Sequence, residues 1–143
     1  MQTGNALHLT VHDDSAPAEA AIVDAGLDAS NAEAAPLRNV QPLAVFAREP
    51  VGAVVGGAVG RTWGECCELR QLWVAASYRG QGLGSRLIRA FERHAAERGC
   101  RLAYLDTFSF QARPFYEALG YEVVLQINGF GDGISKYTMT RSL

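Results

Sequence analysis

Arg79-Gly80-Gln81-Gly82-Leu83-Gly84-Ser85 joins a predicted strand to the start of a predicted helix. Glycine has no Cβ, so the glycines in this segment let the backbone approach a ligand closely. The first N–H groups of a helix lack intrahelical acceptors, and the helix dipole places partial positive charge at the same end. Such a helix start binds anions, and Arg79 can add a guanidinium that hydrogen-bonds phosphate oxygens. The segment is therefore predicted to bind a pyrophosphate group.

Two other glycine-rich motifs that bind nucleotides fit this segment poorly. A Walker loop ends in Gly-Lys-Ser or Gly-Lys-Thr, whereas this segment ends in Gly84-Ser85-Arg86. A dinucleotide-binding fingerprint needs a third glycine three residues after the second, and Leu87 occupies that place. That fingerprint also follows the first strand of its domain, whereas several predicted strands precede Arg79. A tight turn without a ligand stays the alternative.

The residues on both sides of the segment predict a strand, a helix and another strand. Glu65 to Val74 and Leu102 to Asp106 are apolar enough for buried strands. Gly82 to Arg98 has the helical period, and Gly99 is a C-terminal stop. The apolar face of this helix consists of Leu83, Leu87, Ile88, Phe91 and Ala95. A strand–helix–strand unit of this length predicts a parallel pair of strands.

The rest of the chain predicts further strands and helices around this unit. Strands are predicted at Leu7 to Val11, Leu43 to Ala47, Val51 to Val59, Tyr121 to Ile127 and Lys136 to Arg141. Helices are predicted at Ala18 to Ala29 and Ala112 to Leu119, a turn at Asp13, Asp14, Ser15 and Pro17, and a short helix with a loop at residues 31–42. This order predicts an α/β fold in a single domain over residues 1–143. Its mixed, mostly antiparallel sheet would have about six to seven strands, with helices on both faces.

Composition excludes several classes of protein. The chain has 143 residues, a net charge of −2 and a pI of about 5.9, so nucleic acid is not expected as the main partner. Residues 1–11 are too polar for a signal peptide, and no apolar run is long enough to span a membrane. Cys66, Cys67 and Cys100 form neither a disulfide framework nor a zinc-type spacing, so we expect packing residues and no metal. A cytoplasmic protein without membrane contact is expected.

The glycine-rich segment resembles the acetyl-CoA signature of the GNAT superfamily of N-acetyltransferases, R/Q-x-x-G-x-G/A. Arg79, Gly82 and Gly84 match it, and Leu72-Trp73-Val74 resembles the hydrophobic strand that precedes it. The frequent proline after that strand is Ala76 here. A second segment, Ala112-Arg113-Pro114-Phe115-Tyr116-Glu117-Ala118-Leu119-Gly120-Tyr121, resembles the family pattern A-x-x-F-Y-x-x-x-G-F/Y. The order of elements is similar to the family fold over nearly the whole chain.

The resemblance implies that acetyl-CoA is the co-substrate. Backbone N–H groups of the loop would bind the pyrophosphate, the pantetheine arm would pair with the preceding strand, and the Val74 N–H would polarise the thioester carbonyl. The residues implied in binding acetyl-CoA are Trp73, Val74, Arg79, Gln81, Gly82, Leu83, Gly84, Ser85 and Ser109. Ser109 stands where the family has an asparagine.

The resemblance also implies direct transfer to an amine. Tyr116 takes the position of the tyrosine that protonates the departing thiolate, and packing in the core is the alternative role. An alkyl amine is mostly protonated at neutral pH, so a base is needed. Glu68 is the candidate because, by period-2 alternation, it shares a strand face with Val74. A solvated carboxylate is the alternative, and Glu65 is the reserve base.

The acceptor cannot be read from a motif. A small-molecule primary amine is expected, and Asp106 and Thr107 end a strand where ligands gather, although a turn or cap role also fits them. A non-catalytic acyl-CoA-binding or sensing module and an interaction subunit are the alternatives. In an interaction subunit, residues 128–133 could dock the partner; their composition equally suits a flexible loop that lines the acceptor pocket. Many relatives dimerise, so the resemblance also suggests a homodimer.

Overall fold

The computed structural model describes residues 6–13 and 17–143, and it divides the chain into two compact units, residues 1–34 and residues 35–143. The first unit contains helix α1, Glu19–Asn31, which has no buried residue. The predicted helix at Ala18 to Ala29 is thereby confirmed, whereas the predicted turn at Asp14 and Ser15 lies outside the described residues. A single domain over residues 1–143 stays a prediction.

The predicted strand from Leu7 to Val11 is wrong. Residues 6–13 form neither helix nor strand, and the apolar side chains of this stretch are almost fully exposed. Alternating side chains give a segment one apolar face, but a strand also needs a neighbouring backbone with which to form hydrogen bonds. No described residue pairs with this stretch as a strand.

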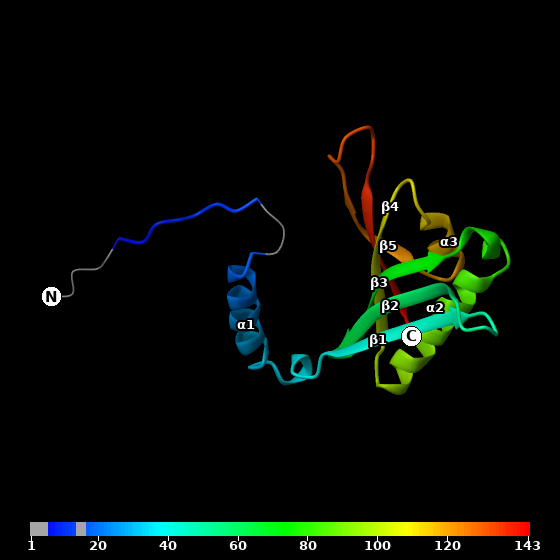
Figure 1. Ribbon diagram of the computed structural model, residues 1–143, viewed down its shortest axis with the longest axis horizontal. Coiled ribbons are helices and arrows are strands. Elements are labelled where there is room, and N and C mark those ends of the chain that lie inside the picture. Colours follow the sequence, from blue (N-terminus) through cyan, green and yellow to red (C-terminus); the bar gives the residue numbers. More distant parts are fainter. Residues whose placement is uncertain (1–5, 14–16) are drawn as a thin grey trace. The chain divides into compact units, whose positions relative to one another are not determined.

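The second unit contains one six-stranded sheet in the order β1-β2-β3-β4-β6-β5 (Figure 1). Its strands are β1 Gln41–Arg48, β2 Val54–Trp63, β3 Cys66–Val74, β4 Leu102–Phe108, β5 Glu122–Ile127 and β6 Lys136–Ser142. Only β3 and β4 pair in parallel; every other neighbouring pair in the described sheet is antiparallel. The predicted mixed, mostly antiparallel α/β fold is confirmed, with six strands.

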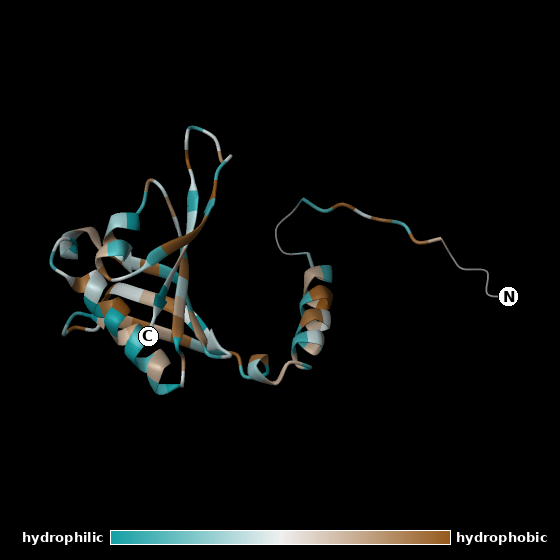
Figure 2. Cartoon of the chain, turned by 180° about the vertical axis from the view of Figure 1, so that it is seen from behind, coloured by the Kyte–Doolittle hydropathy of each residue, from teal (hydrophilic) through white to brown (hydrophobic). Residues whose placement is uncertain are grey.

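Helix α2, Leu83–Glu97, covers one face of the sheet and contacts β1, β2 and β3. It lies behind these strands in Figure 1 and in front of them in Figure 2, where brown segments mark the apolar parts of the strands. Leu87, Ile88 and Phe91 are buried in its apolar face, and each such side chain contributes about 1.5–3 kcal/mol by leaving water. No helix among the described residues has the length and apolar character to cross a membrane.

Helix α3, Arg113–Ala118, lies on the same side of the sheet as α2. Its Tyr116 is buried in the core cluster that also contains the buried residues of α2, and Arg89 of α2 donates a 3.1 Å hydrogen bond to the Leu119 carbonyl. Short 3₁₀ turns occur at Ala35–Leu37 and Ala76–Tyr78. Within residues 35–143 both α-helices therefore cover one face, and helices on the second face stay a prediction. We call the sheet face away from α2 the far face.

One carboxylate is buried between α2 and the sheet. Glu92 accepts hydrogen bonds from Tyr121 at 2.8 Å, Arg89 at 2.9 Å and Arg141 at 3.1 Å. A buried carboxylate is tolerated only when it is paired and hydrogen-bonded. These contacts join α2 to β6 and to the residue before β5. Hydrogen bonds are directional, so they fix the orientation of α2 on the sheet in addition to the apolar contacts.

A β-bulge interrupts β3 at Arg70. Gln71 pairs with Val59 of β2 and Leu69 pairs with Gly60, so Arg70 is the extra residue. Cys67 and Leu69 face α2 before the bulge, but after it Leu72 and Val74 do, and Glu68 points to the far face. The predicted shared face of Glu68 and Val74 is therefore wrong, because the bulge shifts the alternation by one residue.

The bulge requires a glycine on the neighbouring strand. A Cβ on Gly60 would overlap the Glu68 carbonyl oxygen and would lie 3.0 Å from the Phe91 ring. The missing side chain thus lets the bulged strand and α2 approach β2 at the same point.

We expect Gly60→Ala to lower the free energy of unfolding by about 3 kcal/mol, because the new methyl group must displace backbone. Urea denaturation measures the change. Gly57→Ala is the matched control on the same strand: its Cβ would lie 2.9 Å from the ring of Phe46, which is half-exposed and can shift, and at an ordinary contact distance of 3.4 Å from the Val45 carbonyl oxygen. The control should lose less than about 1 kcal/mol. Equal losses in the two variants would contradict the role given to Gly60.

Candidate functional site

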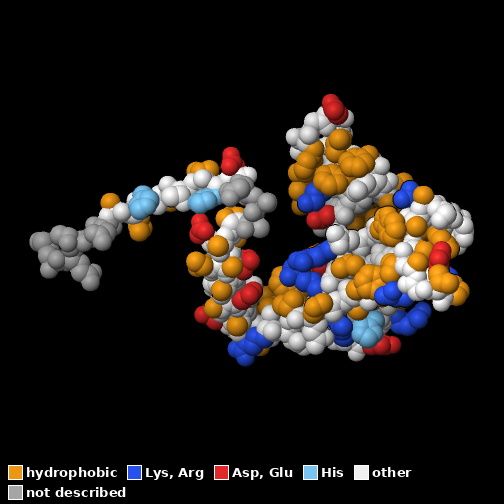
Figure 3. Space-filling model, in the orientation of Figure 1, with side chains coloured by type: hydrophobic (Ala, Val, Ile, Leu, Met, Phe, Trp, Pro, Cys, Tyr) orange, Lys and Arg blue, Asp and Glu red, His pale blue; other side chains and the backbone are white. Residues whose placement is uncertain are grey.

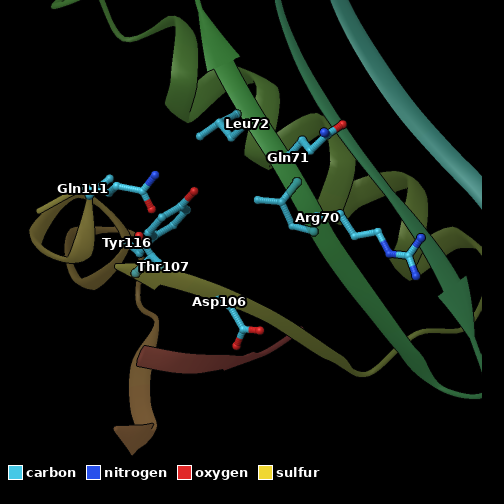
Figure 4. A pocket seen from close by; sticks show the side chains of 9 residues that line it. Arg70, Gln71, Leu72, Asp106, Thr107, Gln111 and Tyr116 are labelled. Carbon is cyan, nitrogen blue, oxygen red and sulfur yellow. The ribbon is translucent and has the colours of Figure 1, made fainter. Parts of the chain in front are cut away.

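The parallel pair β3 and β4 opens at one end. Its register runs from Cys66–Leu102 to Leu69–Leu105, and beyond that point the strands no longer pair. A cavity occupies the opening, and Figure 4 shows the side chains around it. It is lined by Leu69, Arg70, Gln71, Leu72, Asp106, Thr107, Gln111, Ala112 and Tyr116. The opening lies at the carboxyl ends of two parallel strands, where ligands bind in α/β sheets.

A second cavity begins at the glycine-rich loop and shares Leu72 and Ala112 with the first. Gly80 and Gly82 have φ of 73° and 80°, a backbone conformation that residues other than glycine rarely adopt. Gly82 precedes α2 without a side-chain cap, and the first hydrogen bond back to it comes from the Arg86 N–H. Leu83, Gly84 and Ser85 therefore present backbone N–H groups at the cavity, as a helix start that binds an anion does.

Gly84 brings three elements together at this cavity. Its Cβ, if present, would lie 3.3 Å from the Phe115 ring of α3 and 3.9 Å from a Val74 methyl group of β3. The loop backbone can therefore sit close to both elements, which leaves a narrow apolar wall beside the helix start. An anion site next to an apolar slot suits a ligand with a charged end and an extended uncharged arm.

Tyr116 closes the opening between β3 and β4 from the side of α3. Its side chain is only 7% exposed, and its hydroxyl makes no hydrogen bond to a described residue. Figure 4 shows this hydroxyl directed toward the gap between the strands. Burial raises the pKa of Tyr116, so the phenol keeps its proton at neutral pH. The residue is placed to donate a proton to an atom in the cavity.

Glu68 lies on the far face in a network of hydrogen bonds. It accepts from Arg70 Nε at 2.6 Å and from the Tyr104 hydroxyl at 2.8 Å, and Arg61 Nε lies 3.5 Å from the carboxylate. Trp63 Nε1 in turn donates to the Tyr104 hydroxyl at 2.9 Å. Burial alone would raise the pKa of Glu68, but the bonds from Arg70 and Tyr104 and the charge of Arg61 lower it. Glu68 is therefore a carboxylate at neutral pH.

A third cavity connects Glu68 to the opening. It is lined by Glu68, Leu69, Arg70, Tyr104, Leu105 and Asp106, and three of these residues also line the opening. The loop cavity therefore shares residues with the opening between β3 and β4, and the opening shares residues with the cavity on the far face. A ligand bound at the loop could thus reach a second ligand that enters from the far face.

The structure brings together most of the residues predicted for this site. Val74, Arg79, Gly82, Leu83, Gly84 and Ser85 line the loop cavity, and Tyr116 and Glu68 line the two cavities that follow. Arg79 Nε donates a 2.9 Å hydrogen bond to the Val74 carbonyl, which fixes the arginine beside the end of β3. The side chain of Gln81 donates to the Ser77 carbonyl at 3.2 Å, so it is turned back toward the preceding 3₁₀ turn.

Three predicted residues lie elsewhere. Trp73 is 53% exposed and lines none of these cavities, and Ser109 exchanges hydrogen bonds with Ser135, so their contact with a cofactor stays a prediction. Glu65 precedes β3 at the end away from the glycine-rich loop, and lines a separate cavity there.

The cysteines have the surroundings of packing residues. Cys67 is fully buried, and this burial raises its pKa to about 12, which keeps the thiol protonated. Burial also raises the pKa of Cys100. Among residues 6–13 and 17–143, no group of three or more His, Cys, Asp or Glu side chains is arranged to hold a metal ion.

Sequence reasoning missed several residues of the site. Arg70, Tyr104 and Gln111 received no role, although each lines a cavity between β3 and β4. A signal for Arg70 exists: apolar residues repeat every two positions at Cys67 and Leu69, but the next is Leu72, three positions on. That break in alternation marks the bulge. Tyr104 and Gln111 have no such local signal, because only the pairing of β3 with β4 brings them to the site.

The chain matches the Acetyltransferase (GNAT) family over residues 8–121. It is 36% identical over 112 residues to blasticidin-S acetyltransferase of Streptomyces morookaense, an alignment that covers 76% of this chain and 82% of that protein. A crystal structure of an acetyltransferase from Bacillus cereus superposes with a TM-score of 0.81 and 26% identity, over 94% of this chain and 98% of the other. An aminoglycoside 6′-N-acetyltransferase solved with coenzyme A gives a TM-score of 0.64 and 25% identity, over 77% of each chain.

The lowered pKa of Glu68 predicts a pH-dependent contribution to stability. A carboxyl whose pKa falls on folding stabilises the native state above its unfolded pKa, and this stabilisation is lost as the pH falls through the folded value. We expect Glu68→Gln to destabilise the protein more at pH 7 than at pH values well below about 4.3. Urea denaturation at both pH values measures the difference, with Glu122→Gln on the exposed edge of β5 as control. A difference independent of pH would contradict the network around Glu68.

Proposed function

The chain belongs to the acetyltransferase (GNAT) family, and we propose on that basis that it transfers an acetyl group from acetyl-CoA to a primary amine of a small molecule. One observation carries the proposal: three cavities share residues from an uncapped helix start, past an unbonded tyrosine hydroxyl, to the far face of the sheet. A donor bound at the loop and an acceptor on the far face would meet between β3 and β4.

The residues at the loop fit the parts of acetyl-CoA. The backbone N–H groups of residues 81–85, together with Arg79, would hold the pyrophosphate, since they combine free donors with the positive end of α2. Leu72, Val74 and Phe115 form an apolar wall suited to the pantetheine arm. The absence of a side chain at Gly84 keeps this passage narrow but open. The Val74 N–H stays our candidate for polarising the carbonyl of the acetyl group.

When bound, acetyl-CoA supplies an acetyl thioester, whose sulfur leaves as a thiolate that requires a proton. Tyr116 is proposed as the general acid. Its buried hydroxyl faces the opening, is not engaged by any described residue, and has a raised pKa that keeps the proton in place until it is needed. Tyr116 is the one tyrosine among the described residues that line the opening, whereas Tyr104 lines the neighbouring far-face cavity and donates its hydroxyl hydrogen to Glu68.

Glu68 stays our candidate for accepting the proton of the attacking amine. It is charged at neutral pH and lines the cavity next to the opening. Its lowered pKa makes it a weaker base than a free carboxylate, and the Tyr104 and Arg70 donors already occupy both of its oxygens. We therefore propose that a water molecule carries the proton between amine and carboxylate.

The acceptor class is proposed from the relatives. One relative is named for blasticidin-S and one structural neighbour for aminoglycosides, and both names describe transfer to small molecules. A small-molecule amine also suits a site formed by short cavities between two strands rather than by an extended groove.

Gly82→Glu tests the binding of acetyl-CoA. A side chain at Gly82 is strained because φ is 80°, and its carboxylate would stand against the pyrophosphate. We expect calorimetry to show micromolar binding to the wild type and at least a hundredfold weaker binding to the variant. Gly99→Glu is the matched control, because Gly99 also has positive φ and open surroundings but lines no cavity of the site. Absence of binding to the wild type would remove the proposed function.

Tyr116→Phe tests the general acid. Removing one proton donor should lower kcat by about a hundredfold or more, with little change in the affinity for acetyl-CoA. Release of free thiol from coenzyme A measures the rate. Tyr121→Phe is the control: it removes a buried hydroxyl that bonds Glu92, so it should lower stability and leave kcat nearly unchanged. A kcat for Tyr116→Phe within threefold of the wild type would contradict the assignment.

A further inference from the structure

Two arginines share one carboxylate on the far face of the sheet. Arg61 and Arg70 both contact Glu68, at 3.5 Å and 2.6 Å, and Tyr104 donates to the other carboxylate oxygen. We call Arg61, Glu68, Arg70 and Tyr104 the arginine cluster. Figure 3 shows basic side chains gathered on this side of the molecule, next to hydrophobic and acidic ones.

The charges of the arginine cluster do not balance. One carboxylate faces two guanidiniums, which leaves one excess positive charge. A second carboxylate, that of Asp106, lines the same cavity, but it is already engaged. Lys136 Nζ lies 3.3 Å from Asp106, and the Thr138 hydroxyl donates to it at 2.6 Å. The excess charge therefore stays at the cavity.

Arg70 is the arginine available to a ligand. The guanidinium of Arg61 lies 4.1 Å from the Trp63 ring centre, in a stacked contact, and the Arg61 side chain is 25% exposed. The Arg70 side chain is 55% exposed. Its Nε is fixed by Glu68, while its two terminal nitrogens make no hydrogen bond to a described residue. Those nitrogens can form the paired hydrogen bonds with which arginine binds a carboxylate or phosphate.

The position of Arg70 follows from the bulge. As the extra residue of β3, it extends from the strand where the pairing of β3 with β4 ends, and it lines both the opening and the cavity on the far face. In Figure 4 its side chain and that of Tyr116 lie on different sides of β3, along the edge of the same cavity. A group held by Arg70 would thus lie beside the reacting atoms without occupying their place.

We infer that Arg70 binds an anionic carboxylate or phosphate group of the acceptor, so that the enzyme selects amines that carry such a group. The inference rests on the proposed function, because it assigns the far-face cavity to the acceptor. Arg70 is then a specificity-determining residue, and Glu68 positions it through the Nε hydrogen bond.

Matched pairs of amines test this assignment. Each pair has an anionic member and an uncharged counterpart: 4-aminobutyrate with 4-aminobutanamide, and O-phosphoethanolamine with ethanolamine. We would measure kcat/KM for each amine at saturating acetyl-CoA, and its binding to the protein–coenzyme A complex by calorimetry. The carboxylate and phosphate pairs distinguish the two kinds of anion. For the wild type we expect the anionic member of at least one pair to be preferred by about tenfold or more.

Arg70→Gln should bring that ratio close to one, because glutamine keeps hydrogen-bonding groups but not the charge. Arg101→Gln removes the same charge from an exposed position that lines none of the three cavities, and it should keep the wild-type ratio. Thermal melting confirms that both variants fold, as expected for exposed side chains.

Two results would overturn the inference. One is a wild-type protein that binds acetyl-CoA yet neither prefers nor binds any anionic member. The other is an Arg70→Gln variant that keeps the wild-type preference. Failure to bind acetyl-CoA at all would instead remove the proposed function, so the two failures are distinguishable.

Discussion

The close approach of Gly60 to the bulged β3 determines which side chains of β3 face α2 and which point to the far face. Because Gly60 has no side chain, the Glu68 carbonyl can stand where a Cβ would be, and β3 can carry one more residue than β2. From Arg70 onward the faces of β3 are exchanged. Leu72 and Val74 turn toward α2 and form the wall of the loop cavity, while Glu68 is left on the far face. A regular strand would have placed Glu68 and Val74 on one face.

The same irregularity separates two environments. On the side of α2, Tyr116 is buried, and this burial raises its pKa, so it holds its proton. On the far face, hydrogen bonds from Arg70 and Tyr104 and the charge of Arg61 overcome the effect of burial and lower the pKa of Glu68. One group is therefore kept neutral and the other charged, although both line connected cavities at the end of the β3–β4 pairing. Opposite pKa shifts at one site are typical of residues with separate acid and base roles.

Much of this arrangement could be read from the sequence. The helix predicted over residues 82–98 occurs as Leu83–Glu97, since a strong 3.6-residue period and a glycine at each end leave few alternatives. The glycine-rich loop could be predicted because its glycines directly precede this helix. The prediction of a strand at Leu7 to Val11 failed because alternation of apolar residues does not show whether a partner strand is present. The assignment of faces in β3 failed at Arg70, where a bulge depends on Gly60, ten residues away in the chain. Tyr104 and Asp106 come to the site only through the pairing of β4 with its neighbours.

The excess positive charge bears on how an amine could lose its proton here. Glu68 is held by Arg61 and Arg70, so its lowered pKa widens the gap to the pKa of an alkyl ammonium and makes direct transfer to the carboxylate costlier. The one excess positive charge of the arginine cluster acts in the opposite direction on the substrate, because like charges nearby disfavour an ammonium ion. An amine bound beside Arg70 would thus be deprotonated more easily than in water. If its own anionic group paired with Arg70, that advantage would shrink, so acceptor recognition and amine activation draw on the same charge. The distance between amine and anion in the acceptor then decides the balance, which favours molecules that keep the two groups apart.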